Sequence, residues 1–141
     1  MSFPYQSKDE IDAVVRGFES CTTSKTGFPH QSHLTVATWY VYEFTLEQAM
    51  DKMRAGLLRF IEHHGVDPEK YNETLTVFWL KMIEKQVNQL DSDLSLIEVT
   101  NAVINALGNS SLVFEYYSPE LLKSQAAKKK WIEPDLKPFR E

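Results

Sequence analysis

The chain has 141 residues, which predicts one domain (residues 1–141) large enough to bury a core without metal or disulfide crosslinks. Hydrophobic residues make up 43% and charged residues 25% of the chain, an ordinary balance that argues against wholesale disorder. The formal net charge of −5 favours solubility and argues against a nucleic-acid partner, because a phosphate backbone demands a clustered basic face.

The cysteine content and the distribution of apolar residues indicate a compartment. Cys21 is the single cysteine of the sequence and cannot form an internal disulfide. The first residues do not resemble a secretory signal, since no basic segment is followed by an apolar stretch. No window approaches the roughly 18 consecutive apolar residues of a membrane span. We therefore expect a soluble, cytoplasmic protein with no membrane partner.

The first expected helix covers residues 8–19. Ser7 and Glu10 form a capping box, in which two side chains satisfy free backbone N–H groups at a helix start. The apolar residues that follow share one face at the 3.6-residue period of a helix. The stretch CTTSKTGFP then predicts a loop, because hydroxyl side chains, glycine and proline interrupt helices.

Residues 30–43 form the second expected helix, and their apolar side chains cover nearly its whole circumference. Such a helix is usually central and surrounded by other helices. The β-branched and aromatic residues of this segment also fit a strand. The spacing leaves that alternative open, although we favour the helix.

Two longer helices are expected next. Thr45 and Gln48 form a second capping box, which begins a helix that ends near Gly65, a residue suited to the left-handed conformation that closes helices. Another helix restarts at Pro68, because proline suits a first helical turn. Its apolar stripe continues to about residue 90.

The C-terminal third of the chain predicts shorter elements. Ser95 and Glu98 form a third capping box, whose helix ends at Gly108. A cap at Ser118 followed by proline predicts a short helix to about Lys130.

The last residues, about 131–141, contain two prolines and no helical period. We expect an extended tail there, with Trp131 and Phe139 as anchors on the surface of the domain. Together these elements predict an all-α fold, a single-domain bundle of about five to six helices with an extended C-terminal tail.

The sequence lacks several familiar catalytic and metal-binding motifs. It contains no Cys-x-x-Cys pair, no His-Glu-x-x-His and no Glu-x-x-His of the kind that builds di-iron sites in bundles. It also lacks a glycine-rich phosphate loop and a Gly-x-Ser-x-Gly motif. No particular cofactor is therefore indicated.

His30 and His33 share one face of the second helix if that helix has begun by residue 30. Two imidazoles can bind one metal ion, but transition metals take three or four ligands. Glu73, Glu43 or His64 would then have to approach from elsewhere in the chain. The alternatives are an acid–base or substrate-binding pair, or histidines that only bond the backbone near a helix start.

The stretch KYNETLTVFW places polar side chains near the start of the fourth helix. Glu73 is in register with Val77 and Leu80, and a carboxylate buried on that side would need partners or take up a proton. Alternatively, Asn72 and Glu73 serve only the helix start, where such side chains satisfy free N–H groups.

Three stretches, FPHQSHLTVATWY, KYNETLTVFW and EYYSPELLKSQAAKKKWIEPDL, resemble in order the blocks of a family of small uncharacterised bacterial proteins. The family pattern is Phe-x-His-x-x-His before an apolar helix, then Tyr-His-Glu-Thr-x-Thr, then Tyr-Tyr-Ser, Leu-x-Ser and a terminal Pro-Asp. The resemblance spans roughly three-quarters of the chain and implies a bacterial protein, but no particular reaction. The matching positions are His30, His33, Tyr71, Glu73, Thr74, Thr76, Tyr116, Tyr117, Ser118, Ser124, Pro134 and Asp135.

The chain departs from this family pattern at Asn72, where the family has histidine. Asparagine donates and accepts hydrogen bonds, but it does not transfer protons near neutral pH and is a poor transition-metal ligand. Acid–base or metal chemistry at this position would therefore be lost or altered. A capping or ligand-orienting role would be kept.

We expect a small-molecule site between the second and fourth helices, since bundle interiors commonly house such sites. His33 and Glu73 are its candidate catalytic residues, as base and partner carboxylate. The candidate ligand-binding residues supply hydrogen bonds and apolar walls: His30, Asn72, Thr74, Trp39, Tyr40 and Trp79. A metal bound by His30, His33 and Glu73 is the less favoured alternative.

A second function class stays open, a non-catalytic helical protein that binds another protein or forms a homo-oligomer. Three features favour it: the second helix is apolar all round, the tail is aromatic, and no catalytic set is complete.

Overall fold

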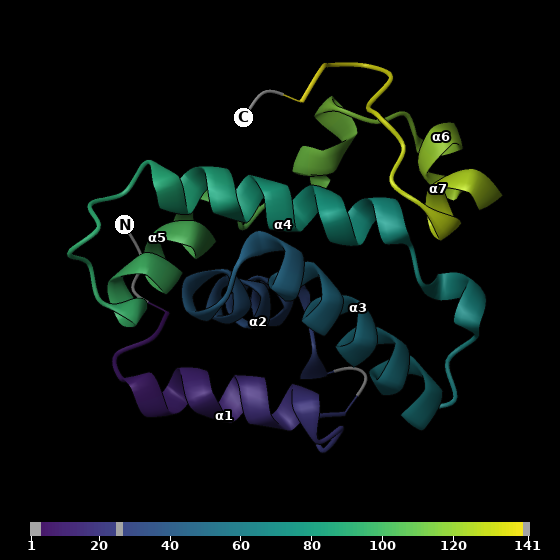
Figure 1. The fold of residues 1–141 in the computed structure, drawn as a ribbon. Coiled ribbons are helices and arrows are strands. Elements are labelled where there is room, and N and C mark those ends of the chain that lie inside the picture. The colour runs from purple at the N-terminus through teal and green to yellow at the C-terminus, as the bar shows by residue number, and fades with distance from the viewer. Residues whose placement is uncertain (1–3, 25–26, 140–141) are drawn as a thin grey trace.

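The computed structural model describes residues 4–24 and 27–139, and across these residues it contains helices and no strand, so the all-α prediction is confirmed (Figure 1). The five longer helices run as α1 Lys8–Glu19, α2 His30–Glu43, α3 Leu46–His63, α4 Glu73–Asn88 and α5 Leu96–Leu107. The shorter elements are the 3₁₀ helices η2 Pro68–Lys70 and η3 Ser110–Glu115, and the helices α6 Pro119–Lys123 and α7 Gln125–Lys129.

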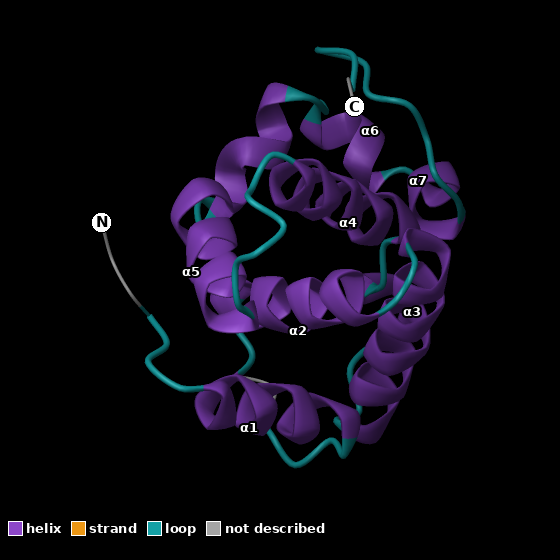
Figure 2. Cartoon of the chain, turned by 60° about the vertical axis from the view of Figure 1, so that its left-hand side comes forward, coloured by secondary structure: helices purple, strands orange, loops and turns teal. Residues whose placement is uncertain are grey.

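Helix α2 lies in the middle of the bundle, as its all-round apolar sequence predicts. It contacts α1, α3, α4 and α5, and both views show these four helices arranged around it (Figures 1 and 2). Leu34, Val36, Ala37 and Tyr40 are buried on different sides of α2. The segment is helical rather than a strand because helices cover its whole circumference, so its apolar side chains need no sheet to bury them.

Local signals set most helix ends where the sequence predicts them. All three capping boxes form, at Ser7, Thr45 and Ser95. Gly65 follows α3 with a φ of +66°, the left-handed conformation that closes a helix at low cost for glycine.

The fourth helix begins later than predicted. Pro68 starts only the short η2, Tyr71 is extended, and α4 begins at Glu73. Asn72 caps α4, its side-chain oxygen accepting the Leu75 backbone N–H at 3.0 Å. The cap requires extended backbone at Asn72, so a helix that ran on from Pro68 through Asn72 could not form it. The helix that carries the apolar stripe therefore begins only after Asn72.

The C-terminal helix is also divided. Ser124 has extended backbone and caps α7, its hydroxyl accepting the Ala127 N–H, so one expected helix becomes α6 and α7. The sequence analysis also missed η3, where Asn109 accepts the Ser111 N–H at 3.0 Å. Short caps of this kind break helices without leaving a change in apolar period.

The tail packs where its aromatic residues predict. A second apolar cluster lies on the outer side of α4 and is formed by Phe78, Val113, Tyr116, Tyr117 and Leu122. Trp131 and Phe139 pack against this cluster, which confirms them as anchors. Backbone bonds fix the tail as well, since the Leu136 N–H donates to the Tyr116 carbonyl at 2.9 Å. Residues 140 and 141 lie outside the described part.

Within the described residues, no helix combines the length and the apolar character that crossing a bilayer requires.

Candidate functional site

A cavity of about 380 Å³ lies between α2, α3 and α4. A water molecule needs about 30 Å³, so the cavity is large enough for an organic molecule. Its apolar wall comprises Leu34, Ala37, Met53, Leu57, Ile61, Leu75, Trp79, Leu80 and Ile83. Its polar groups are His30, His33, Lys70, Tyr71, Asn72 and Thr76. The predicted site between the second and fourth helices therefore coincides with a cavity, and α3 closes its third side.

His33 projects from the first turns of α2 and is largely enclosed. Its ring lies 4.3 Å from the ring of Phe28, measured between centroids. Burial, with a smaller contribution from the neighbouring His30, lowers the pKa of His33 from 6.5 to about 4. The imidazole is therefore neutral at pH 7. No hydrogen bond joins its side chain to another group in the described part of the chain, and the ring lines the cavity wall.

His30 is fixed by a hydrogen bond. Its Nε2 lies 3.0 Å from the Leu107 carbonyl oxygen of α5. A carbonyl can only accept, so Nε2 carries the hydrogen and donates it to Leu107. The ring also meets Trp79 edge-on, with centroids 4.6 Å apart. His30 and Trp79 thus form one wall of the cavity across α2 and α4.

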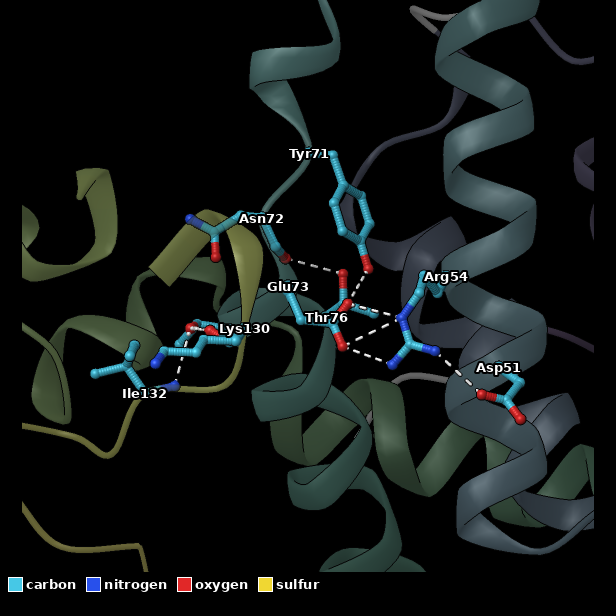
Figure 3. A network of polar contacts seen from close by, with 9 residues as sticks. Asp51, Arg54, Tyr71, Asn72, Glu73, Thr76, Lys130 and Ile132 are labelled. Carbon is cyan, nitrogen blue, oxygen red and sulfur yellow. Dashed lines mark hydrogen bonds and ion pairs between the residues drawn. The ribbon is translucent and has the colours of Figure 1, made fainter. Parts of the chain in front are cut away.

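Glu73 is buried at the start of α4, where Arg54 of α3 neutralises it (Figure 3). Arg54 donates from Nε at 2.9 Å and from a terminal nitrogen at 2.6 Å, and its other terminal nitrogen pairs with Asp51 at 3.0 Å. Burial alone would raise the pKa of Glu73, but the hydrogen bonds from Arg54 and Tyr71 and the charge of Arg54 outweigh it and lower the pKa. Glu73 is therefore an ionised carboxylate, and both of its oxygens already accept hydrogen bonds from Arg54 or Tyr71.

Tyr71 connects this ion pair to the cavity. Its hydroxyl donates to Glu73 Oε1 at 2.5 Å, and its side chain lines the cavity wall (Figure 3). Burial, followed by the bond to Glu73, raises the pKa of Tyr71, so the hydroxyl keeps its proton. Glu73 itself does not line the cavity and makes no hydrogen bond or ion pair with His33 in the described residues. The predicted His33–Glu73 pair does not form. Glu73 bonds to Arg54 and Tyr71 instead, and Tyr71 shares the cavity wall with His33.

The metal alternative finds no support in the geometry. Across the described residues, no three His, Cys, Asp or Glu side chains are grouped so that they could hold an ion. His30 and His33 are not joined by Glu73, because Arg54 and Tyr71 already occupy both of its oxygens.

Asn72 and Thr74 bind the C-terminal region. The Asn72 Nδ2 donates to the Leu122 carbonyl at 2.7 Å, while its oxygen caps α4. The Thr74 hydroxyl donates to the Lys130 carbonyl at 2.8 Å and accepts the Ile132 N–H at 3.2 Å. Asn72 borders the cavity, but its polar atoms are occupied elsewhere. Thr74 does not line the cavity, since α4 turns it towards the tail.

Only one of the three aromatic residues predicted to form apolar walls lines the cavity. Trp79 lines the cavity, whereas Trp39 and Tyr40 face other neighbours of α2. Trp39 packs against the main core with the Lys8 Nζ 5.7 Å from its ring, and the Tyr40 hydroxyl donates to Glu19 at 2.6 Å. Trp39 and Tyr40 lie on the parts of α2 that face α1 and the rest of the main core, away from the cavity.

Four polar residues of this region were not among the predicted site residues: Arg54, Lys70, Tyr71 and Thr76. Tyr71 and Thr76 stand in the family-like block, which offered a signal for them. Arg54 lies in an ordinary amphipathic helix, and nothing in its local spacing marks a partner on α4.

Comparisons of the chain with models of protein families, with curated proteins and with solved structures find no match.

Proposed function

We propose that this chain is a small-molecule-binding protein whose site is the cavity between α2, α3 and α4. The observation that carries the proposal is His33, a neutral imidazole on the wall of an apolar cavity with no hydrogen-bond partner in the described residues. A ligand in the cavity can hydrogen-bond to this imidazole without breaking any bond within the protein.

The surrounding residues support binding in different ways. Nine apolar side chains provide the contact area, and His30 presents a ring held in one orientation by Leu107. Arg54 and Glu73 act one step away, since Glu73 fixes the Tyr71 hydroxyl. In this proposal Glu73 is a positioning residue and His33 is the group that contacts the ligand.

The test is to add a small amphipathic probe and follow backbone amide shifts by NMR. We expect 3-phenylpropanoate or its neutral amide, 3-phenylpropanamide, to shift the signals of cavity residues on α2, α3 and α4. The variant Ala37→Leu fills the cavity and abolishes these shifts. The matched control Ala55→Leu changes an exposed residue of α3 and retains them. Absence of binding by both probes, or equal binding by Ala37→Leu, contradicts the proposal.

The alternative, a protein that oligomerises or binds another protein, stays a prediction with less support. Most of the apolar surface of α2 is covered by helices of the same chain, with Tyr42 near its C-terminal end 42% exposed, and the tail aromatics pack on the cluster beside α4. Most of the residues behind the two sequence features that favoured the alternative therefore have partners within the bundle. Light scattering tests it, since a strictly monomeric protein counts against a homo-oligomer.

A further inference from the structure

The charge of the cavity wall differs from that of the whole chain. The chain contains 20 Asp and Glu residues against 15 Lys and Arg. Yet no acidic residue lines the cavity, and Lys70 is its one permanently charged group among the described residues. Glu73, the nearest acid behind Tyr71, is neutralised by Arg54. The cavity is therefore positively biased in an otherwise acidic protein.

The start of α2 adds to this bias. His30 and His33 occupy its first two turns, and α2 alone among the α-helices of the described chain has no side-chain cap at its N-terminus. Its first turn also lacks acidic residues. The free N–H groups of a helix start carry a partial positive charge that favours anions. This end of α2 therefore favours an anionic group. The imidazole of His33, which has no hydrogen-bond partner in the described residues, offers a group to which a ligand can bond.

Resting on the proposed function, we infer that the ligand is an amphipathic organic acid. Its carboxylate lies at the polar end of the cavity with His33 and Lys70, and its aliphatic or aromatic body lies against the apolar wall of α3 and α4. On binding, His33 takes a proton from solvent and donates it in a hydrogen bond to the carboxylate. One proton is taken up, and no covalent bond of the ligand forms or breaks.

The groups around His33 permit this protonation. His30 is the titratable group on its own helix, and Lys70 and Tyr71 are those of the segment before α4. The residues that α3 and α4 contribute to the cavity wall carry no ionisable side chain, and the ring of Phe28 covers one side. No carboxylate of the protein thus contacts the imidazole, and burial, with a smaller contribution from His30, lowers its pKa in the free protein. An incoming carboxylate supplies the opposite charge that favours the protonated imidazole.

The test compares two probes of the same shape by calorimetry at pH 7. We expect 3-phenylpropanoate to bind at least about tenfold more tightly than 3-phenylpropanamide, because a charge-assisted hydrogen bond replaces a neutral one. The binding heat of the acid should differ between phosphate and Tris buffers, as proton uptake requires, and that of the amide should not. This comparison uses the unaltered chain.

Two variants assign the effect to named groups. His33→Gln retains a hydrogen-bonding side chain but cannot take a proton, so the buffer dependence disappears and the preference for the acid falls. His63→Gln, the same change at an exposed residue, leaves both unchanged. Lys70→Gln reduces the preference for the acid, whereas Lys123→Gln, at an exposed residue of α6, does not.

The outcomes separate this inference from the proposed function. If the amide binds as tightly as the acid, the organic-acid inference is overturned and the proposed function stands. If the acid binds without proton uptake, or His33→Gln keeps the buffer dependence, the role of His33 is overturned. If neither probe binds, the proposed function itself fails.

Discussion

His33 couples the cavity to pH through its enclosure. Its pKa of about 4 in the folded chain lies below the ordinary value of 6.5, so the unfolded chain takes up the proton first as pH falls. The free energy of unfolding is therefore highest above pH 6.5 and declines as pH falls towards 4. Enclosure in an apolar cavity thus makes a single imidazole a source of acid sensitivity.

The His33→Gln variant measures this sensitivity. Between pH 7.5 and 5, we expect the free energy of unfolding of the natural chain to fall about 2 kcal/mol further than that of His33→Gln. Urea titrations at the two pH values provide the comparison, with His63→Gln as the control. Equal pH dependence in the natural chain and His33→Gln would show that His33 does not titrate differently in the two states.

Glu73 acts in a lower pH window. Because its pKa in the folded chain lies below the ordinary 4.5, the Arg54 and Tyr71 bonds stabilise the fold above that pH and are lost as the carboxyl group takes a proton. We expect Glu73→Gln to lower the free energy of unfolding at pH 7 by about 2 kcal/mol, a value moderated by the partial exposure of Arg54.

Thermal and urea unfolding at pH 7 and pH 3 test this expectation. The deficit of Glu73→Gln should shrink at pH 3, because the carboxyl group of the unfolded chain is protonated below its ordinary pKa of 4.5 and the stabilisation by the ionised form declines. Asp51→Asn is the matched control, since Asp51 is an exposed partner of the same Arg54 and its loss costs less. A larger effect from Asp51→Asn would contradict the assignment of Glu73 as the principal partner.

For individual residues, the sequence predicted which side chains line the cavity better than it predicted which side chains pair with one another. His30, His33 and Trp79 line one cavity, as helical spacing and order along the chain suggested. The pairing of Glu73 was missed because its partner Arg54 is 19 residues away on another helix. Spacing defines neighbours on one helix, whereas an ion pair between helices depends on how those helices are rotated about their axes.

The start of α4 shows how one side chain sets the end of an element. Asn72 caps the helix with its oxygen and holds α6 with its nitrogen, so both ends of the amide are used. These two bonds account for asparagine at this position. A hydrogen-bonding role needs no proton transfer, which is the function that asparagine lacks.

Two variants separate the roles of Asn72. Asn72→Ala removes both bonds and should lower the free energy of unfolding by about 2 kcal/mol. Asn72→Asp retains the cap but places a carboxylate oxygen against the Leu122 carbonyl, so amide exchange should increase in α6 while the start of α4 stays protected. Hydrogen exchange followed by mass spectrometry distinguishes these patterns, and unchanged exchange in α6 would contradict the link to Leu122.

Helix positions were predictable where they depend on local caps and periodicity. The capping boxes and the apolar stripes located α1, α3 and α5 closely, and the continuous apolar run located α2. The breaks at Asn72 and Ser124 were not predicted, because a capping side chain inside an apolar stripe leaves the period almost unchanged. The choice between a continuous and an interrupted helix there involves tertiary bonds, such as that from Asn72 to Leu122.

For the molecule as a whole, the C-terminal tail is a separate layer on the outer side of α4. Besides its aromatic anchors, Asp135 accepts the Ser118 N–H at 2.8 Å and the Ser118 hydroxyl at 2.6 Å. These bonds lower the pKa of Asp135. They are exposed, so they hold the tail in place more than they stabilise the core.

The variant Asp135→Ala should therefore release the tail selectively. We expect trypsin to cleave after Lys130 faster in this variant, with little change in the melting temperature of the bundle. Asp93→Ala, at an exposed loop position, is the control and should be cleaved at the natural rate. Unchanged cleavage in Asp135→Ala would show that the aromatic anchors alone hold the tail.

The cavity and its support come from different parts of the chain. Every residue on the cavity wall lies between His30 and Ile83, but the start of α4 is held by Leu122, Lys130 and Ile132. A ribosome delivers the chain from its N-terminus, so the wall is synthesised before the segment that braces it. A chain interrupted before residue 122 would contain all the cavity residues and lack the brace. During synthesis, the support of the cavity is thus completed last, by residues that do not line its wall.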